Sequence, residues 1–430
     1  MEGKLLRLEM GLFPVENIKE GNETTFSDGL LTLNFDQLHE MAMEGRKFED
    51  VSFHIALPGD SIRITNVLDA VEPIHKINGN SSEFPGFLGP ARTAGSGLTH
   101  KLSGMCVLSS TYFLGPQTGI MTCREGIIDM SGPGTKFCTN SDTLNLVIRF
   151  IPLVNSTNIE HDDAVRLVTL RISSWLASLT KDMSPKETKV YELTDVDPSL
   201  PKVVYVDQVM HQAPMVQTFM YGKDLGDSLP TLIHPNEMLD GAVVGANYKT
   251  SQKVPTYLHC NKPLIHELYG RHGVDLNFVG MIITRGHRDN QALKERSAQY
   301  VAKLAKILRA DGAVLSFEGG GNSSVDYWLT VQALEQMDIS AVPIIYEVGR
   351  PGTEEFPLVY HVPEADSIVS KGANGDKVDA PAMEKVIGSE KIFLYGGQEF
   401  DAYGNLKITN SDYYATEWAL DINGFVGKDF

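Results

Sequence analysis

The chain lacks the features typical of membrane-spanning, secreted and nucleic-acid-binding proteins. No run of about 18 apolar residues is present, so no transmembrane helix is expected. The first ten residues contain neither an apolar signal core nor a small-residue cleavage site. Lys and Arg number 37 against 55 Asp and Glu, a net charge of −18 that argues against binding to nucleic acid or an anionic membrane. We therefore expect a cytoplasmic protein with neither type of partner.

Cysteine is also scarce. The four cysteines form no Cys-x-x-Cys pair and are widely spaced: Cys106, Cys123, Cys138 and Cys260. This usage is typical of a reducing compartment. His259 and Cys260 are adjacent, a poor spacing for one metal ion, and His266-Glu267 begins a His-Glu-x-x-His motif that ends at Gly270 instead of histidine. We expect no metal site.

The fold class predicted from the residues is α/β in two parts. Extended segments joined by turns dominate the first 150 residues, among them a hairpin over residues 25–33 with an Asp28-Gly29 turn. Apolar residues at helical spacing then predict a long helix over 162–179. These patterns indicate a mainly-β N-terminal domain over residues 1–190 with one long helix, followed by a polar linker over 180–201 that contains the domain boundary.

From residue 202 onward, strands and helices alternate. Strands are predicted over 203–206, 278–284, 313–317 and 341–348, and a helix over 291–309. Such alternation is typical of a mostly parallel sheet covered by helices. We expect a C-terminal α/β domain over residues 200–430, with a β-hairpin around 403–405.

Ligands of open α/β sheets bind beyond the carboxyl ends of the strands. The glycine-rich loop after Phe317 carries Glu318 and leads to Asn322. The alternative is that these glycines form a tight turn and Glu318 caps a helix. His100 and His234 are candidates for acid–base or binding roles, although Pro235 also marks a helix start beside His234.

Cys260 likewise allows two interpretations. It is a nucleophile if a nearby histidine such as His259 lowers its pKa. Otherwise it is a small, buried, apolar side chain.

Short motifs in a consistent order give the chain a resemblance to a known family. The chain resembles the precursor subunit of glycine, sarcosine and betaine reductase component B, and the motifs are Phe84–Phe87, Gly95–Gly97 with Thr99–His100, Glu125–Gly132, Pro230–Ile233, Asp240–Ala242, Pro255–Tyr257, Leu268–Tyr269 with Arg271–Gly273, Asn277–Gly280 and Glu295–Ser297. The resemblance implies reductive cleavage of a carbon–nitrogen bond. It also implies a larger partner subunit that bears cysteine or selenocysteine, and a small selenoprotein or thiol carrier.

In that family, a cysteine follows the asparagine that stands here at Asn247 and becomes a pyruvoyl group. This chain has Tyr248 at that position. Tyrosine carries a ring on Cβ and supplies neither the nucleophile nor the leaving group of that chemistry. Ser251 is the remaining candidate, so we expect no cofactor unless the chain cleaves at Ser251 to give a pyruvoyl group.

Two functional hypotheses follow. In the first, the chain is a subunit of an oxidoreductase with a disulfide as acceptor and binds a small amine or carboxylate, within an oligomeric complex. Its candidate catalytic residues are Tyr248, Ser251, His259 and Cys260, and its candidate substrate-binding residues are His100, His234, Asn247, Glu318 and Asn322. In the second, the chain is a non-catalytic binding or scaffold subunit of a component-B-like complex.

Overall fold

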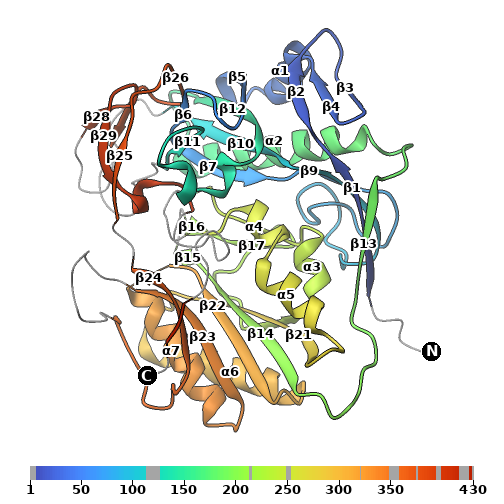
Figure 1. The fold of residues 1–430 in the computed structure, drawn as a ribbon, viewed down its shortest axis with the longest axis vertical. Helices are drawn as coiled ribbons and strands as arrows, with labels where there is room; N and C mark the ends of the chain where they lie inside the picture. Colours follow the sequence, from blue (N-terminus) through green and yellow to red (C-terminus); the bar gives the residue numbers. More distant parts are fainter. Residues whose placement is uncertain are drawn as a thin grey trace.

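The N-terminal strands and the C-terminal parallel sheet lie at opposite ends of the molecule, with short helices between them (Figure 1). The structure is a computed structural model that describes residues 6–112, 126–212, 216–247, 253–319, 321–347, 358–373, 376–393, 399–415 and 426–428. The yellow helices α3 (Pro235–Leu239), α4 (Thr256–Cys260) and α5 (Pro263–Arg271) lie between the blue-to-green strands and the C-terminal sheet in Figure 1. Residues at this junction therefore contact both halves.

Two sheets of four strands form most of the N-terminal half, as far as it is described. Their strand orders are β13-β1-β9-β8 and β5-β12-β10-β7. The strands are β1 (Arg7–Pro14), β5 (Phe48–Ala56), β7 (Val67–Val71), β8 (Ile74–Lys76), β9 (Gly97–Ser103), β10 (Met105–Thr111), β12 (Leu144–Pro152) and β13 (Glu187–Glu192). The helix α2 (Asn158–Ser178) packs against them and begins with a capping box in which Thr157 and Glu160 satisfy each other's backbone N–H groups. The predicted long helix is confirmed.

The predicted hairpin near the N-terminus is also present, and a short helix follows it. Strands β3 (Thr25–Ser27) and β4 (Leu30–Leu33) pair antiparallel, and β2 (Asn17–Glu20) pairs parallel with β4. Asp28 and Gly29 have φ of 49° and 79°, as a type I′ turn requires at both central residues. Asn34 caps α1 (Phe35–Met43) by accepting a hydrogen bond from the backbone N–H of Gln37.

A mostly parallel sheet confirms the predicted α/β fold class. Its order among the described residues is β19-β21-β14-β22-β23-β24-β30, and only the edge strands β19 and β30 run antiparallel to their neighbours. The strands are β14 (Lys202–Val209), β19 (Thr231–Ile233), β21 (Asn277–Arg285), β22 (Gly312–Phe317), β23 (Ser340–Glu347), β24 (Ile368–Ala373) and β30 (Val426–Lys428). The helices α6 (Gln291–Ile307) and α7 (Asn322–Glu335) pack against each other on one face.

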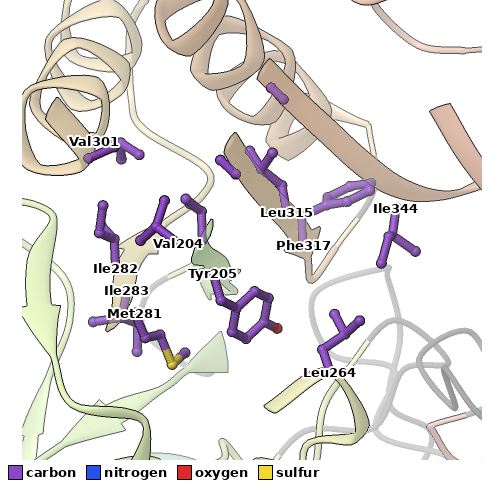
Figure 2. Packing of buried hydrophobic residues seen from close by; sticks show 14 of the residues in the cluster. Val204, Tyr205, Leu264, Met281, Ile282, Ile283, Val301, Leu315, Phe317 and Ile344 are labelled. Carbon is purple, nitrogen blue, oxygen red and sulfur yellow. The ribbon is translucent and has the colours of Figure 1, made fainter. Parts of the chain in front are cut away.

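The order of the central strands places a candidate site. β14 comes first in the chain, yet it lies between β21 and β22. The strands that follow it are therefore added first on one side of β14, with β21, and then on the other side, with β22. This reversal is a topological switch point, where open α/β sheets bind ligands beyond the carboxyl ends of their strands. Figure 2 shows the apolar core around β14, with Val301 of α6 and Leu264 of α5 on opposite sides of the strands.

Small strands complete the junction and the C-terminal segment. They are β6 (Ile62–Ile64), β11 (Ile128–Asp129), β15 (His211–Gln212), β16 (Val216–Gln217), β17 (Phe219–Met220), β18 (Lys223–Asp224), β20 (Val243–Val244), β25 (Lys377–Ala380), β26 (Lys385–Ile387), β27 (Lys391–Phe393), β28 (Glu399–Asp401) and β29 (Leu406–Thr409).

Two sequence-based expectations need correction. The predicted hairpin around 403–405 is wrong, because β28 pairs with β27 whereas β29 pairs with β25. The stretch 180–201 is not only a linker, since it contains β13, which pairs with β1. The division into domains at residues 190–200 stays a prediction, and β26 of the later part pairs with β6 of the earlier part.

A fully buried ion pair in the N-terminal half contacts the C-terminal segment 381–413. Arg63 donates to both carboxylate oxygens of Asp129, at 2.6 and 3.2 Å, and to the backbone carbonyls of Pro381, Ala402 and Gly404. Tyr413 donates its hydroxyl to Asp129 at 2.9 Å. These three side chains and three carbonyls, here called the Arg63 cluster, use all five guanidinium donors.

Candidate functional site

A buried group of charged side chains lies at the carboxyl ends of β14 and β22. Lys253 Nζ is 3.4 Å from Glu318 Oε2, and His259 Nε2 is 3.4 Å from Glu318 Oε1. Lys262 Nζ lies 2.5 Å from Asp207 Oδ2. Each of these side chains is at most 3% exposed. We call these five residues the Lys253 cluster.

The backbone positions the cluster from several elements. Asp207 is in β14, and Glu318 directly follows β22. His259 lies in α4, whose first residue Thr256 donates from its backbone N–H and its hydroxyl to Asp69 of β7, at 2.9 and 2.5 Å. Asp69 thus caps α4 from the N-terminal half. The cluster is therefore held at the junction of the two halves.

The two acidic groups of the cluster differ in how well they are partnered. Asp207 accepts from Lys262 at 2.5 Å and from the Ser316 hydroxyl at 3.0 Å. One oxygen of Glu318 is 3.4 Å from Lys253 and the carboxylate also accepts from the backbone N–H of Met210, but Oε1 has no hydrogen-bond partner among the described residues. Burial raises the pKa of Glu318, and the nearby cations Lys253 and Lys262 oppose that rise.

His259 is held in its neutral form. Burial, reinforced by the positive charges of Lys262 and Lys253, lowers its pKa well below the usual value. Neither ring nitrogen has a hydrogen-bond partner among the described residues, because the 3.4 Å approach to Glu318 is not aligned for one. The cluster therefore offers a neutral imidazole and a carboxylate oxygen to a small polar ligand.

Asn247 is buried at the same junction. Its side-chain Nδ2 donates to the backbone carbonyl of Asp162 in α2 at 2.8 Å, while its Oδ1 has no partner among the described residues. Tyr248 and Ser251 fall outside the described residues.

Cys260 lies next to His259 but in a different environment. Burial raises the pKa of its thiol to about 12, while the nearby Lys101 opposes the rise. The thiol is therefore protonated near neutral pH, which favours the interpretation of a buried apolar side chain. Its predicted catalytic role stays a prediction.

The remaining candidates lie apart from the Lys253 cluster in the pattern of contacts. His100 is buried in β9, and its Nδ1 lies 3.1 Å from both the carbonyl and the hydroxyl oxygen of Thr180. His234 caps α3 by accepting from the backbone N–H of Asn236 at 3.2 Å, the helix start that Pro235 suggests. Asn322 is an exposed residue at the start of α7, and its carbonyl accepts from Lys294 at 3.3 Å. These contacts favour structural roles, and binding roles for the three stay predictions.

Comparison with known proteins explains the resemblance among the motifs. A sequence model of the "Glycine/sarcosine/betaine reductase component B subunits" matches residues 6–402. The chain belongs to this family. It is 36% identical over 393 residues to the "Glycine reductase complex component B subunits alpha and beta" of Peptoclostridium acidaminophilum, covering 89% of each chain.

Two further relatives come from the same organism. Identity to the "Sarcosine reductase complex component B subunit alpha" is 36% over 393 residues, covering 89% of each chain. Identity to the "Betaine reductase complex component B subunit alpha" is 35% over 411 residues, covering 91% of this chain and 90% of the relative. No solved structure matches the chain.

The residues of this family member do not fit a pyruvoyl group at the Asn247–Tyr248 bond. The side chain of Tyr248 has no heteroatom on Cβ to attack the preceding carbonyl. Asn247 is instead held by its bond to α2, at 2.8 Å.

Sequence reasoning missed three members of the cluster: Asp207, Lys253 and Lys262. A signal for Asp207 was present, because it follows the apolar run Val203–Val206 at the carboxyl end of a predicted strand. Lys253 and Lys262 flank His259 in the sequence, but only the tertiary fold brings them to Asp207 and Glu318.

The described residues contain no group of three or more His, Cys, Asp or Glu side chains arranged to hold a metal ion. In the same part of the chain, every helix is too short or too polar to cross a membrane.

Proposed function

We propose that this chain is the substrate-binding subunit of a component-B-like reductase. It binds a small amine or carboxylate at the Lys253 cluster and carries no pyruvoyl group. A larger partner subunit bearing a thiol or selenol, together with a small selenoprotein or thiol carrier, completes the reductive cleavage of a carbon–nitrogen bond, and a disulfide is the oxidised product.

The under-partnered pair of Glu318 and His259 supports this proposal most strongly. Both side chains are buried, yet Glu318 Oε1 and the His259 ring nitrogens lack hydrogen-bond partners among the described residues. Buried polar groups in folded proteins are nearly always partnered. Perturbed titratable groups at a switch point are also the usual sign of a functional site.

The proposed reaction needs no covalent step on this chain. The partner's thiolate or selenolate attacks the carbon bonded to nitrogen, and the amine leaves with the electron pair of the broken bond. A second thiol then attacks the sulfur or selenium, the freed carbon takes a proton, and the two chalcogens remain joined. Glu318 and His259 contribute by holding the ligand in a site that lacks bulk water.

Absence of a pyruvoyl group limits the substrates to those that need no Schiff base. A quaternary amine has no N–H to condense with a ketone, and one relative is named as a subunit of a betaine reductase. That relative supports the proposal, because betaine carries a quaternary nitrogen and a carboxylate.

Intact mass spectrometry and calorimetry test the proposal on the full chain. We expect one unmodified full-length mass, and micromolar to millimolar binding of at least one of glycine, sarcosine and betaine. Glu318→Gln should weaken that binding about tenfold through loss of a charged partner. Glu16→Gln, at a carboxylate that is 66% exposed, is the matched control and should leave binding unchanged.

Other outcomes would contradict the proposal. Two fragments that split near residue 250, the smaller one reactive with hydroxylamine, would establish a carbonyl cofactor. Binding of none of the three ligands, with assembly onto the partner subunit intact, would favour the scaffold role instead.

A further inference from the structure

Arg166 is a further buried cation at the junction of the two halves, in addition to Lys253 and Lys262. It extends from α2, and its guanidinium carbon lies 4.1 Å from the ring centroid of Phe219 in β17. Its Nη1 donates to Asp163 at 2.8 Å, but the Asp163 carboxylate is 63% exposed while Arg166 is only 5% exposed. The ion pair therefore has a well-solvated anion and a desolvated cation.

The guanidinium has spare hydrogen-bonding capacity. Its Nε is buried and has no hydrogen-bond partner among the described residues. Burial lowers the pKa of Arg166, and attraction by Asp162, Asp163 and Asp69 does not fully compensate. Arg63 shows the contrast, since all of its five donors are used.

Arg166 is one turn along α2 from the backbone carbonyl that Asn247 contacts. Long side chains on a helix point back over the preceding turn, so the guanidinium lies over the turn that contains Asp162. Asn247 docks on the Asp162 carbonyl at 2.8 Å and has an unpartnered Oδ1. Asp69 interacts electrostatically with both Arg166 and Lys253. Arg166 thus belongs to the same buried junction as the Lys253 cluster.

We propose that Arg166 is the residue that binds the carboxylate of the substrate. A guanidinium fork matches a carboxylate in geometry and charge, and its unpartnered Nε supplies a donor that no described residue uses. Glycine, sarcosine and betaine, named in the relatives' descriptions, share such a carboxylate. This assignment rests on the proposed function, because it requires that the chain binds a small molecule here.

The test compares each zwitterion with its counterpart that lacks the carboxylate. Calorimetry on the full chain would use glycine against methylamine, sarcosine against dimethylamine, and betaine against tetramethylammonium. For the ligand that binds, we expect the carboxylate to improve the wild-type affinity about tenfold to a hundredfold. Arg166→Met should reduce this ratio to near one, and Arg166→Lys should retain part of it, because lysine keeps the charge and loses the fork.

The matched control is Arg171→Met on the same helix. Arg171 is 33% exposed and pairs with Glu44, so its loss should leave the affinity ratio unchanged. Thermal unfolding identifies any variant that fails to fold, and if Arg166→Met does so, the ratio for Arg166→Lys decides.

An unchanged ratio in the folded Arg166 variants would overturn the assignment and leave the proposed function standing. If the wild-type chain binds no zwitterion at all, the proposed function fails, and the role of Arg166 fails with it.

Discussion

The Arg63 cluster and the Lys253 cluster are both fully buried and both join segments that are far apart in the sequence. In the first, Arg63 uses five donors, and both oxygens of Asp129 accept hydrogen bonds between 2.6 and 3.2 Å. In the second, Glu318 meets Lys253 and His259 only at 3.4 Å, and one of its oxygens lacks a partner among the described residues. Buried charged side chains are thus fully hydrogen-bonded in the Arg63 cluster and only partly hydrogen-bonded in the Lys253 cluster.

This difference separates a structural role from a binding role. A fully hydrogen-bonded buried network fixes one arrangement of the chain, and the Arg63 cluster fixes the C-terminal strands against β6. A partly satisfied network lowers stability, and its presence at a switch point supports the proposal that a ligand completes it. Stability measurements on the two clusters should therefore give opposite results.

The largest effect is expected at the Arg63 cluster. Arg63→Met leaves Asp129 buried without a cation and leaves three carbonyls without donors, so it should lower the free energy of unfolding by about 3–5 kcal/mol. Urea denaturation of the purified chain measures this loss. The control Arg7→Met removes a cation that is 48% exposed and should cost no more than about 1 kcal/mol. A loss below that amount for Arg63→Met would show that the cluster does not fasten the C-terminal segment.

The double variant Lys253→Met with Glu318→Met is expected not to lower the free energy of unfolding. Replacing a buried ion pair by well-packed hydrophobic side chains of similar volume is often neutral, or stabilises by about 1–4 kcal/mol. We expect urea denaturation to show no loss of stability, and calorimetry to show loss of ligand binding. Arg63→Met with Asp129→Asn is the matched comparison and should still destabilise, because the carbonyls of Pro381, Ala402 and Gly404 lose their donors. Strong destabilisation by the first double variant would assign the Lys253 cluster to structure.

Local signals were sufficient for part of the fold and not for the rest. The hairpin over residues 25–33 was predictable, because an Asp-Gly turn sets its own register. The pairing of β26 with β6 joins residues more than 300 positions apart, and no local pattern encodes it. The turn near residue 404 shows the same limit, because turn residues indicate where the chain reverses and not which strands pair. The site divides similarly: residue type and position pointed to His259 and Glu318, whereas Lys253 and Lys262 became partners only through tertiary folding.

The smallest expected effect is a difference between the two clusters in how the free energy of unfolding depends on pH. His259 faces Lys253, Lys262 and Glu318, and its pKa in the folded chain lies well below 6.5. It is therefore neutral when folded and gains a proton on unfolding below pH 6.5, so stability present above that pH falls as the pH decreases. The slope from this one group is about 1.4 kcal/mol per pH unit. Glu318 changes stability with pH in the opposite direction. Its pKa is raised in the folded chain, so its contribution lowers the stability as the pH rises above 4.5, where the carboxyl ionises in the unfolded chain. Between pH 6.5 and 5.5, urea denaturation of His259→Gln should show a loss smaller than wild type by about 1 kcal/mol, because the unfolded histidine is only half protonated at pH 6.5. Tyr413→Phe in the Arg63 cluster is the control and should leave the wild-type slope unchanged, since tyrosine does not titrate in this range. Equal slopes in wild type and His259→Gln would mean that His259 is already protonated in the folded chain, which the two neighbouring lysines oppose.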